Sequence, residues 1–254
     1  YWSVLKNRLK KTHSELTTSC SQLKMTAADG KRYLTDCFTQ QDILVLVEHI
    51  PSRYAVQFIK WFTYSDDTID GKSRTKAYAL FESGLLASLE PGSVKCLQQI
   101  HAYLFGGLYD FAGQIRDKNI SKGGFQFANA YYFSTILPNI ENMPETTFDE
   151  IINKYVEMNV AHPFMEGNGR STRIWLDLML KRTLKKCIDW SKVNKNAYLE
   201  AMRKSVTDSS DLKALLEPAL TRKINDREMF MKGIDYSYYY ESDDPTLEPD
   251  QKEV

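Results

Sequence analysis

Apolar residues recur at helical spacing over most of the chain. Between residues 148 and 160 they form one continuous stripe, and Thr147 with Glu150 has the spacing of a capping box in front of it. A helix is therefore expected to begin near Thr147. It should end close to His162, because the residue before Pro163 is pushed away from helical geometry.

Two further segments have strong helical patterns. From Arg170 to Lys186 apolar residues cover nearly all sides, which is typical of a helix buried at the centre of its domain. An amphipathic stretch over 94–104 follows Ser93, the expected N-cap. The second half of the chain is therefore expected to be a helical bundle.

The first seventy residues predict a smaller helical region. Residues 1–16 are basic and amphipathic and are expected to form a helix with a solvated face, with nucleic-acid binding as the alternative. Helices are also expected over 39–50, where Pro51 ends the pattern, and over 52–64. Residues 65–71 have the composition of a linker, which places a domain boundary at residue 70.

One segment has the pattern of strands, and one has the pattern of a tail. Residues 119–128 carry apolar residues on both sides of Lys122-Gly123-Gly124, a hairpin turn signal. The last twenty residues hold seven acids and one base, and most of them are expected to be disordered. The chain is thus divided into a helical region 1–70, a main domain 71–233 and a C-terminal segment 234–254.

Composition narrows the class of protein. The formal net charge of the 254 residues is 0, so nothing draws the whole chain to nucleic acid or to an anionic membrane. The longest apolar run, residues 43–47, is far too short to span a bilayer. Four widely separated cysteines favour reduced thiols and a cytoplasmic location. Because the sequence starts at Tyr1 and not at Met, we expect further residues upstream.

The loop between the two strongest helices has the residues of a phosphate site. Gly167 and Gly169 let main-chain N–H groups approach a ligand closely, and the unpaired N–H groups at the start of the next helix favour anions. Arg170 and Arg173 lie on the first turn of that helix, where two guanidinium groups can bind phosphate oxygens in bidentate fashion.

The same loop has residues for metal binding and proton transfer. Glu166 supplies a hard oxygen ligand for Mg²⁺, which usually binds through one or two carboxylates and substrate phosphates. His162 could take a proton from an attacking hydroxyl, because its ordinary pKa is close to neutral pH. Each residue alone has a structural explanation, but their combination within residues 162–173 favours a catalytic site.

Residues 162–173 resemble the signature of the Fic family, His-x-Phe-x-Asp/Glu-Gly-Asn-Gly-Arg-x-x-Arg, at every fixed position. The resemblance extends over about Ser93 to Glu241 and includes an upstream helix and a hairpin flap. It implies an all-α Fic fold with a β-hairpin flap. It also implies transfer of AMP from ATP to a Tyr, Ser or Thr hydroxyl of a target protein.

The resemblance also implies a role for each residue of the site. His162 would be the general base, and Glu166 would hold Mg²⁺ on the α- and β-phosphates. The rest of the loop would hold the nucleotide, with Gly167, Asn168 and Gly169 at the α-phosphate and Arg170 and Arg173 at the β- and γ-phosphates. The target would lie extended along the flap through main-chain hydrogen bonds, beside Ser121, Lys122, Gly123, Gly124 and Phe125.

A second motif resembles the inhibitory helix that many Fic proteins carry, Ser/Thr-x-x-x-Glu-Gly/Asn. Ser237 and Glu241 match it near the C-terminus, and Glu241 would pair with Arg173. Ser242 stands where the motif has Gly or Asn, residues that favour the end of a helix. The alternative is that this tyrosine-rich segment only packs on the core.

Together these features predict an adenylyltransferase that uses ATP and Mg²⁺ and is autoinhibited by Glu241. The expected partner is a target protein, with a DNA topoisomerase among the candidates that related Fic proteins imply. Self-modification at Tyr238, Tyr239 or Tyr240 and a homo-oligomer are further expectations, and no membrane partner is expected.

Two other functions stay open. The chain could be a DNA-associated regulator whose Fic core binds nucleotide with little turnover, because residues 2–6 and 23–31 are similar to BRO-like phage antirepressor regions. It could also remove AMP or transfer another phosphorylated group, since the same loop would hold the same phosphates.

Overall fold

The computed structural model describes residues 21–26, 31–50 and 68–241, together with Val4, Lys6, Asn7, Leu9, Lys11 and Ala55. The chain divides into two compact units, residues 1–66 and 67–254, which are taken separately below. No helix in these described parts is long and apolar enough to cross a membrane.

The N-terminal unit contains an antiparallel hairpin and a helix. Strand β1, Ser21–Thr26, pairs with β2, Arg32–Cys37, in a register that sets Met25 opposite Tyr33. The expectation that strands occur only within 119–128 is therefore wrong. The overlooked signals are the alternation of Leu23 and Met25 with polar residues and the Asp29-Gly30 pair between the strands, which is typical of hairpins.

The helix of this unit is the one expected after Thr39. Helix α3, Gln40–Glu48, begins where the Thr39 side chain accepts a hydrogen bond from the Asp42 N–H at 3.2 Å. The described residues of the expected helix 1–16 are helical, and Ala55 is the described residue of the expected helix 52–64. Most of both segments lies outside the described residues, and the antirepressor resemblance stays a prediction.

The second unit is mostly helical. Its helices are α5 (Ile69–Leu80), α6 (Leu85–Ser88), α7 (Val94–Phe105), α8 (Phe133–Glu141), α9 (Phe148–Ala161), α10 (Asn168–Leu184), α11 (Lys195–Lys204), α12 (Ser210–Leu216) and α13 (Arg227–Glu241). Short 3₁₀ turns lie at η1 (Ala130–Tyr132), η2 (Trp190–Lys192) and η3 (Glu217–Ala219). Two short antiparallel strand pairs complete it: the hairpin of β3 (Ser121–Lys122) with β4 (Phe125–Gln126), and the pairing of β5 (Cys187–Ile188) with β6 (Leu220–Thr221). The all-α fold with a hairpin flap is thereby confirmed.

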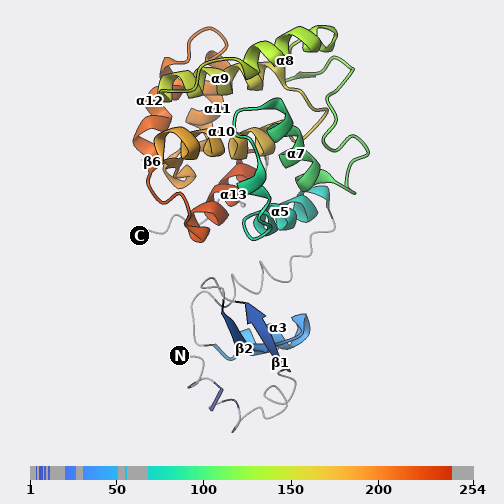
Figure 1. Cartoon of the computed structure of the whole chain (residues 1–254), viewed down its shortest axis with the longest axis vertical. Coiled ribbons are helices and arrows are strands. Elements are labelled where there is room, and N and C mark those ends of the chain that lie inside the picture. Colours follow the sequence, from blue (N-terminus) through green and yellow to red (C-terminus); the bar gives the residue numbers. More distant parts are fainter. Residues whose placement is uncertain are drawn as a thin grey trace. The chain divides into compact units, whose positions relative to one another are not determined.

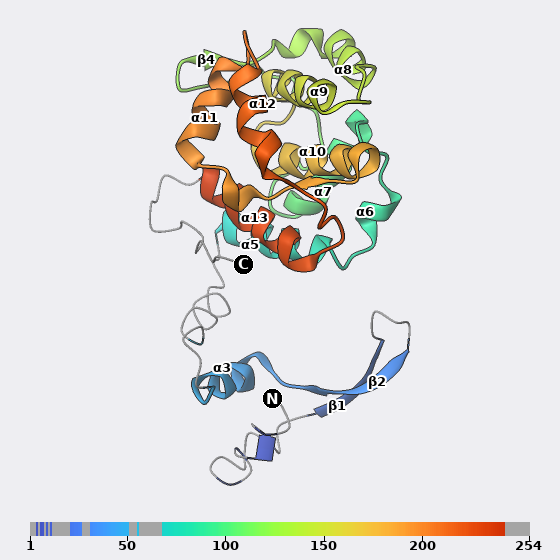
Figure 2. The same ribbon diagram turned by 90° about the vertical axis from the view of Figure 1, so that its left-hand side faces the viewer.

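Helix α10 is the centre of this unit. It lies between α9 and α8 on one side and α13 and α5 on the other, and it also packs against α7 (Figures 1 and 2). Trp175, Leu176 and Met179 are completely buried, as the apolar pattern predicts. Because α10 begins at Asn168, the signature loop leads directly into the first turn of this buried helix.

Local signals define the ends of the helices around the site. Both hydrogen bonds of the Thr147–Glu150 capping box are present, and Ser93 caps α7 through the Cys96 N–H at 3.0 Å. Helix α9 ends at His162 in the left-handed conformation, with φ 50°. The expected boundary at residue 70 lies inside the first turn of α5, and α13 begins at Arg227, before residue 234. The expected disordered tail after Glu241 lies outside the described residues.

Candidate active site

The signature loop is closed by its own side chains. Asn168 is 2% exposed, and its amide accepts from the Phe164 N–H at 2.9 Å and donates to the Phe164 carbonyl at 2.8 Å. Gly167 has φ 79°, and a Cβ there would collide with the ring of Phe105. These contacts bend the chain so that residues 162–167 lead directly into the N-terminus of α10.

His162 is held as a neutral base. Its Nδ1 lies 3.1 Å from the Asn159 carbonyl, and its ring stacks on Phe127 with the ring centroids 3.7 Å apart. A carbonyl can only accept, so the Nδ1 carries the proton and the Nε2 lone pair is available. Burial lowers the pKa of His162 to about 4, which keeps the ring neutral at pH 7.

Arg170 lies beneath the loop between two carboxylates and two rings. It is 4% exposed, donates to Glu166 Oε1 at 3.0 Å and to Asp70 of α5, and stacks between Phe105 and Tyr238. Burial alone would lower the pKa of its guanidinium, but the charges around it, Asp70 first, raise it. This arginine is therefore a fixed positive charge below the first turn of α10.

Arg173 is the second buried arginine, and α13 supplies its partners. Its Nε donates to Ser237 Oγ at 2.8 Å, and its Nη2 donates to the Ser237 carbonyl at 2.9 Å and to Glu241 Oε1 at 2.7 Å. Burial opposes ionisation of Glu241, but Arg173 outweighs it and lowers the pKa of that carboxyl to about 2. The two motifs singled out in the sequence thus meet as an ion pair.

The carboxylate of Glu241 lies over the first turn of α10. A Cβ on Gly169 would lie against Glu241 Oε1 and Arg173 Nη2, so only glycine leaves room for this contact. The other oxygen of Glu241 lies 3.6 Å from Lys122 Nζ on the flap. A negative group therefore lies over the first turn of α10, close to the end of the helix that favours anions.

The flap has an exposed edge beside the histidine. Gly123 and Gly124 form its turn with φ 58° and 81°, and Ser121, Lys122 and Phe125 are all exposed. The Phe127 that follows β4 is the residue stacked on His162. The structure thus brings the expected flap residues to the same site as His162, Arg173 and Glu241.

Glu166 lies at the mouth of the loop. Its side chain is 55% exposed, and Oε1 accepts from the Gly167 N–H at 3.0 Å as well as from Arg170. Among the described residues no group of three or more His, Cys, Asp or Glu side chains is arranged to hold a metal ion.

Three residues of the site escape sequence reasoning as functional groups. Asp70 binds Arg170 from a helix a hundred positions away. His101 is completely buried; its Nε2 lies 2.9 Å from the Glu166 carbonyl, and its Nδ1 accepts from the Gly113 N–H at 2.8 Å. Arg116 binds main-chain carbonyls around His162. In the sequence His101 stands between Ile100 and Ala102, whereas Arg116 lies in a polar stretch, and both fall within the segment that resembles the Fic family.

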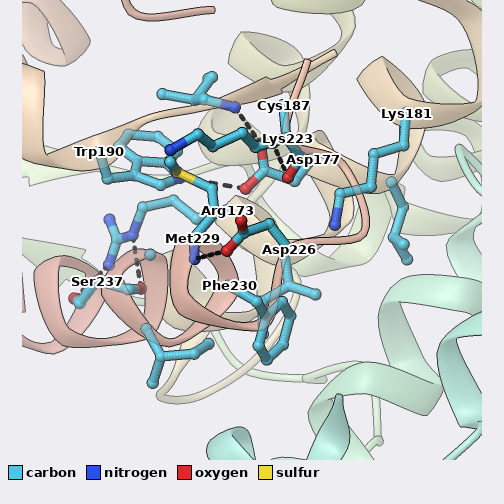
Figure 3. Close-up of a pocket in the computed structure, with 15 residues that line it drawn as sticks. Arg173, Asp177, Lys181, Cys187, Trp190, Lys223, Asp226, Met229, Phe230 and Ser237 are labelled. Carbon is cyan, nitrogen blue, oxygen red and sulfur yellow. Dashed lines mark hydrogen bonds between the residues drawn. The ribbon is translucent and has the colours of Figure 1, made fainter. Parts of the chain in front are cut away.

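A small hollow lies along the seam between α10 and α13. Arg173 and Ser237 form part of its wall, and Asp177, Lys181, Trp190 and Met229 also line it (Figure 3). Residues 162–169 of the signature loop do not line it. The hollow is therefore distinct from the signature loop.

Comparison with known proteins finds a family whose model matches the segment that contains the signature loop. Residues 91–180 match the family model described as Fic/DOC family. Protein adenylyltransferase VbhT of Bartonella schoenbuchensis is 32% identical over 153 residues, which is 54% of this chain and 31% of that protein. The probable protein adenylyltransferase Fic of Salmonella typhimurium is 25% identical over 134 residues, 48% of this chain and 66% of that protein. The chain thus spans less than two thirds of each of these relatives.

Solved structures share the fold. BepC of Bartonella tribocorum, solved with bound AMPPNP, matches with a TM-score of 0.51 at 18% identity over 66% of this chain and 90% of that one. The N-terminal FIC domain of Bep8 from Bartonella sp. 1-1C matches with a TM-score of 0.53 at 14% identity over 63% of this chain and 86% of that one. The signature residues 162–173 lie inside the segment that the family model matches. Residues 91–180 of the chain are therefore similar to the Fic/DOC family.

Proposed function

We propose that the chain is a protein adenylyltransferase that transfers AMP from ATP to a hydroxyl of a target protein and is held inactive by Glu241. The observation that carries the proposal is the placement of a neutral base, His162, in the loop that leads into α10, whose first turn lies under the carboxylate of Glu241. The names of the relatives and the AMPPNP bound by BepC support the same reaction.

The signature loop and the first turn of α10 supply the base and the positive groups for this reaction. The acceptor oxygen attacks the α-phosphorus of ATP, the bond from that phosphorus to the bridging oxygen breaks, and pyrophosphate leaves. The proton of the hydroxyl passes to His162 Nε2, whose lone pair is available because Nδ1–H is donated to Asn159. The N–H groups at the start of α10 and the charge of Arg170 stabilise the phosphates as negative charge redistributes.

The roles within the loop are divided by what each side chain already contacts. The Asn168 amide is hydrogen-bonded to the main chain of Phe164, so its role in this proposal is to hold the shape of the loop. The N–H groups around Gly167 and Gly169 would then bind the α-phosphate. Arg173 would bind the terminal phosphates once Glu241 leaves. Arg170, fixed by Asp70 and Glu166, would act on the β-phosphate mainly through its charge.

The residues present fit a Mg²⁺ ion that arrives with the nucleotide. Glu166 is a single, half-exposed carboxylate next to the phosphate site, and Mg²⁺ commonly combines one or two carboxylates with substrate phosphates and water. Glu166 would hold the ion, which when bound neutralises charge on the phosphates. Binding would compete with the contact from Arg170 to Glu166.

Autoinhibition follows from competition for one cation. While Glu241 is paired with Arg173, a γ-phosphate cannot take the same guanidinium. Phosphoryl-type transfer depends on positioning, so nucleotide displaced by this carboxylate would place its α-phosphate out of line with the acceptor. Release of the end of α13 would free Arg173 for the γ-phosphate and would bring the α-phosphate into line with the acceptor.

The acceptor is a protein segment held along the flap, with DNA topoisomerases among the candidates. The chain itself is a second acceptor in this proposal, but only after α13 is released. At present the Tyr238 hydroxyl donates to Ser73 and the Tyr240 hydroxyl donates to the Val193 carbonyl at 2.8 Å. Tyr239 is partly exposed, with Lys195 over its ring. Modification of these tyrosines would therefore report release.

The test is transfer of label from ATP labelled at the α-phosphate. The Glu241→Gly protein should label itself or lysate proteins in the presence of Mg²⁺, and His162→Ala in the same background should not. His49→Ala, a histidine of the other unit, is the matched control and should label fully. Label from γ-labelled ATP, or loss of AMP from a modified protein, would favour another group transfer or AMP removal. Nucleotide binding without any label would favour the regulatory alternative.

A further inference from the structure

Arg116 binds the flap and the signature loop at the same time. Its Nη1 donates to the Lys118 carbonyl at 2.5 Å, where the chain enters the flap. Its Nη2 donates to the Ala128 carbonyl at 2.7 Å, where the chain leaves the flap. Both ends of the hairpin are therefore fixed by one guanidinium.

The same residue also binds the chain around the base. Its Nη2 donates to the Ala161 carbonyl at 3.0 Å, its Nε donates to the His162 carbonyl at 2.7 Å, and its main-chain N–H donates to the Pro163 carbonyl at 2.8 Å. Three consecutive carbonyls are thus held by one residue. They include that of His162, whose left-handed conformation is uncommon for a residue with a side chain.

The contacts of Arg116 are of a kind that lysine cannot reproduce. It is 4% exposed and rests on the ring of Phe133, and in the described part of the chain no carboxylate lies within ion-pair distance of it. A buried guanidinium surrounded by carbonyls acts as a rigid planar connector, since its N–H groups point in fixed directions. A lysine would keep the charge and direct all its donors from one nitrogen.

We propose that Arg116 is a positioning residue for transfer, because it fixes the flap relative to His162 and so sets where an acceptor hydroxyl meets the base. This inference rests on the proposed function and goes beyond it. The flap holds the acceptor chain and His162 receives its proton, and Arg116 is bonded to both. A second link, the Ala128 N–H to the Val160 carbonyl at 3.1 Å, lies beside it.

The first experiment compares Arg116→Lys with Arg182→Lys in the Glu241→Gly background. Arg182 also donates to a main-chain carbonyl, that of Pro91 at 2.7 Å, but it lies away from the flap and the loop. Arg116→Lys should lower kcat for transfer to a protein acceptor by about 10²-fold, the order expected from a misplacement of about 1 Å. The Kd for ATP should change less than about threefold, and hydrolysis of ATP by water, which does not use the flap, should fall much less than transfer.

The opposite results would overturn the inference. Equal losses in transfer, hydrolysis and ATP binding would make Arg116 a structural residue only, and unchanged transfer would remove it from the site altogether. Arg182→Lys should leave all three unchanged.

Hydrogen exchange of the unsubstituted protein gives a second test that needs no variant and no activity. If one guanidinium joins the flap to the loop, the amides of Ala128 and Arg116 should exchange through one common opening, with rates slowed by the same factor to within about tenfold. Fast exchange at Ala128 with slow exchange at Arg116 would show that the flap moves without the loop, and would overturn the inference. Complete lack of transfer and hydrolysis in Glu241→Gly would refute the proposed function, and the exchange data would still decide the role of Arg116.

Discussion

Replacing Glu241 with glutamine tests whether charge at the first turn of α10 silences the site. The change keeps the size of the side chain and removes its negative charge. In the folded chain the pKa of Glu241 is about 2, below its ordinary 4.5, because Arg173 outweighs burial. The difference between these pKa values, at 1.36 kcal/mol for each unit, corresponds to roughly 3 kcal/mol in favour of the ionised, paired carboxylate.

That magnitude sets the expected effect. Loss of roughly 3 kcal/mol shifts the balance between the held and the released end of α13 by about 100-fold, since 1.36 kcal/mol is a factor of ten. AMP transfer should rise by up to this factor in Glu241→Gln. It should rise at least as far in Glu241→Gly, which also removes the side chain from above Gly169. Because ionisation of Glu241 persists until the pH falls towards 2, the inhibited state should not respond to pH between 5 and 8.

The assay is initial-rate transfer from α-labelled ATP, with Glu228→Gln as control. Glu228 is an exposed glutamate on the first turn of the same helix, so its loss should leave the rate unchanged. Arg173→Ala should stay inactive whether or not Glu241 is replaced, because in the proposed mechanism the same guanidinium serves inhibition and catalysis. Unchanged rates in both Glu241 variants, against lysate proteins and against the chain itself, would show that α13 only packs on the core.

Three further predictions concern the base, the metal and pH. His162→Ala should lower transfer by about 10²–10⁴-fold with ATP binding kept, measured as label incorporation and nucleotide titration; near-normal labelling would exclude it as the base. Glu166→Ala should weaken transfer in a way that excess Mg²⁺ partly restores, and full activity in EDTA would contradict its role. Burial lowers the pKa values of His101 and His162 to about 4, so the unfolded chain binds protons more readily below pH 6.5. The urea concentration at the unfolding midpoint should therefore decrease as the pH is lowered from 6.5 towards 4, and it should decrease less in His101→Gln. A midpoint that does not change with pH would show that the two histidines are not buried as neutral rings.

Helices of the second unit were predictable because their signals are local. The Thr147–Glu150 capping box, the Ser93 cap and the all-round apolar pattern of α10 each lie within a few residues of the feature they define. The hairpin β1–β2 was missed because its two strands carry few apolar residues, and Leu23 and Met25 are half exposed. Because little of this hairpin is buried, its apolar and polar residues alternate only weakly along the sequence.

The candidate site was predictable in its residue types and not in its contacts. The signature fixed the positions of His162 and the two arginines, and the motif at 237–241 suggested the partner of Arg173. The sequence could not show that the Asn168 amide is hydrogen-bonded to the Phe164 main chain. It also could not show that Arg116 donates hydrogen bonds to five carbonyls in the flap and the loop. Every residue type has a main-chain carbonyl that can accept a hydrogen bond, so such bonds leave no recognisable pattern in the amino-acid sequence.

The charges of the Fic/DOC domain are completed by helices outside the matched segment. Residues 91–180 contain Arg170 and Arg173, but Asp70 comes from α5 and Glu241 comes from α13. A buried guanidinium that loses its carboxylate leaves an uncompensated charge, which is strongly destabilising. The flanking helices are therefore part of the folded site, and α13 can leave Arg173 at low cost only when another anion replaces Glu241. A nucleotide phosphate is such an anion, so ATP bound in line with the acceptor should both require the release of Glu241 and stabilise the released state.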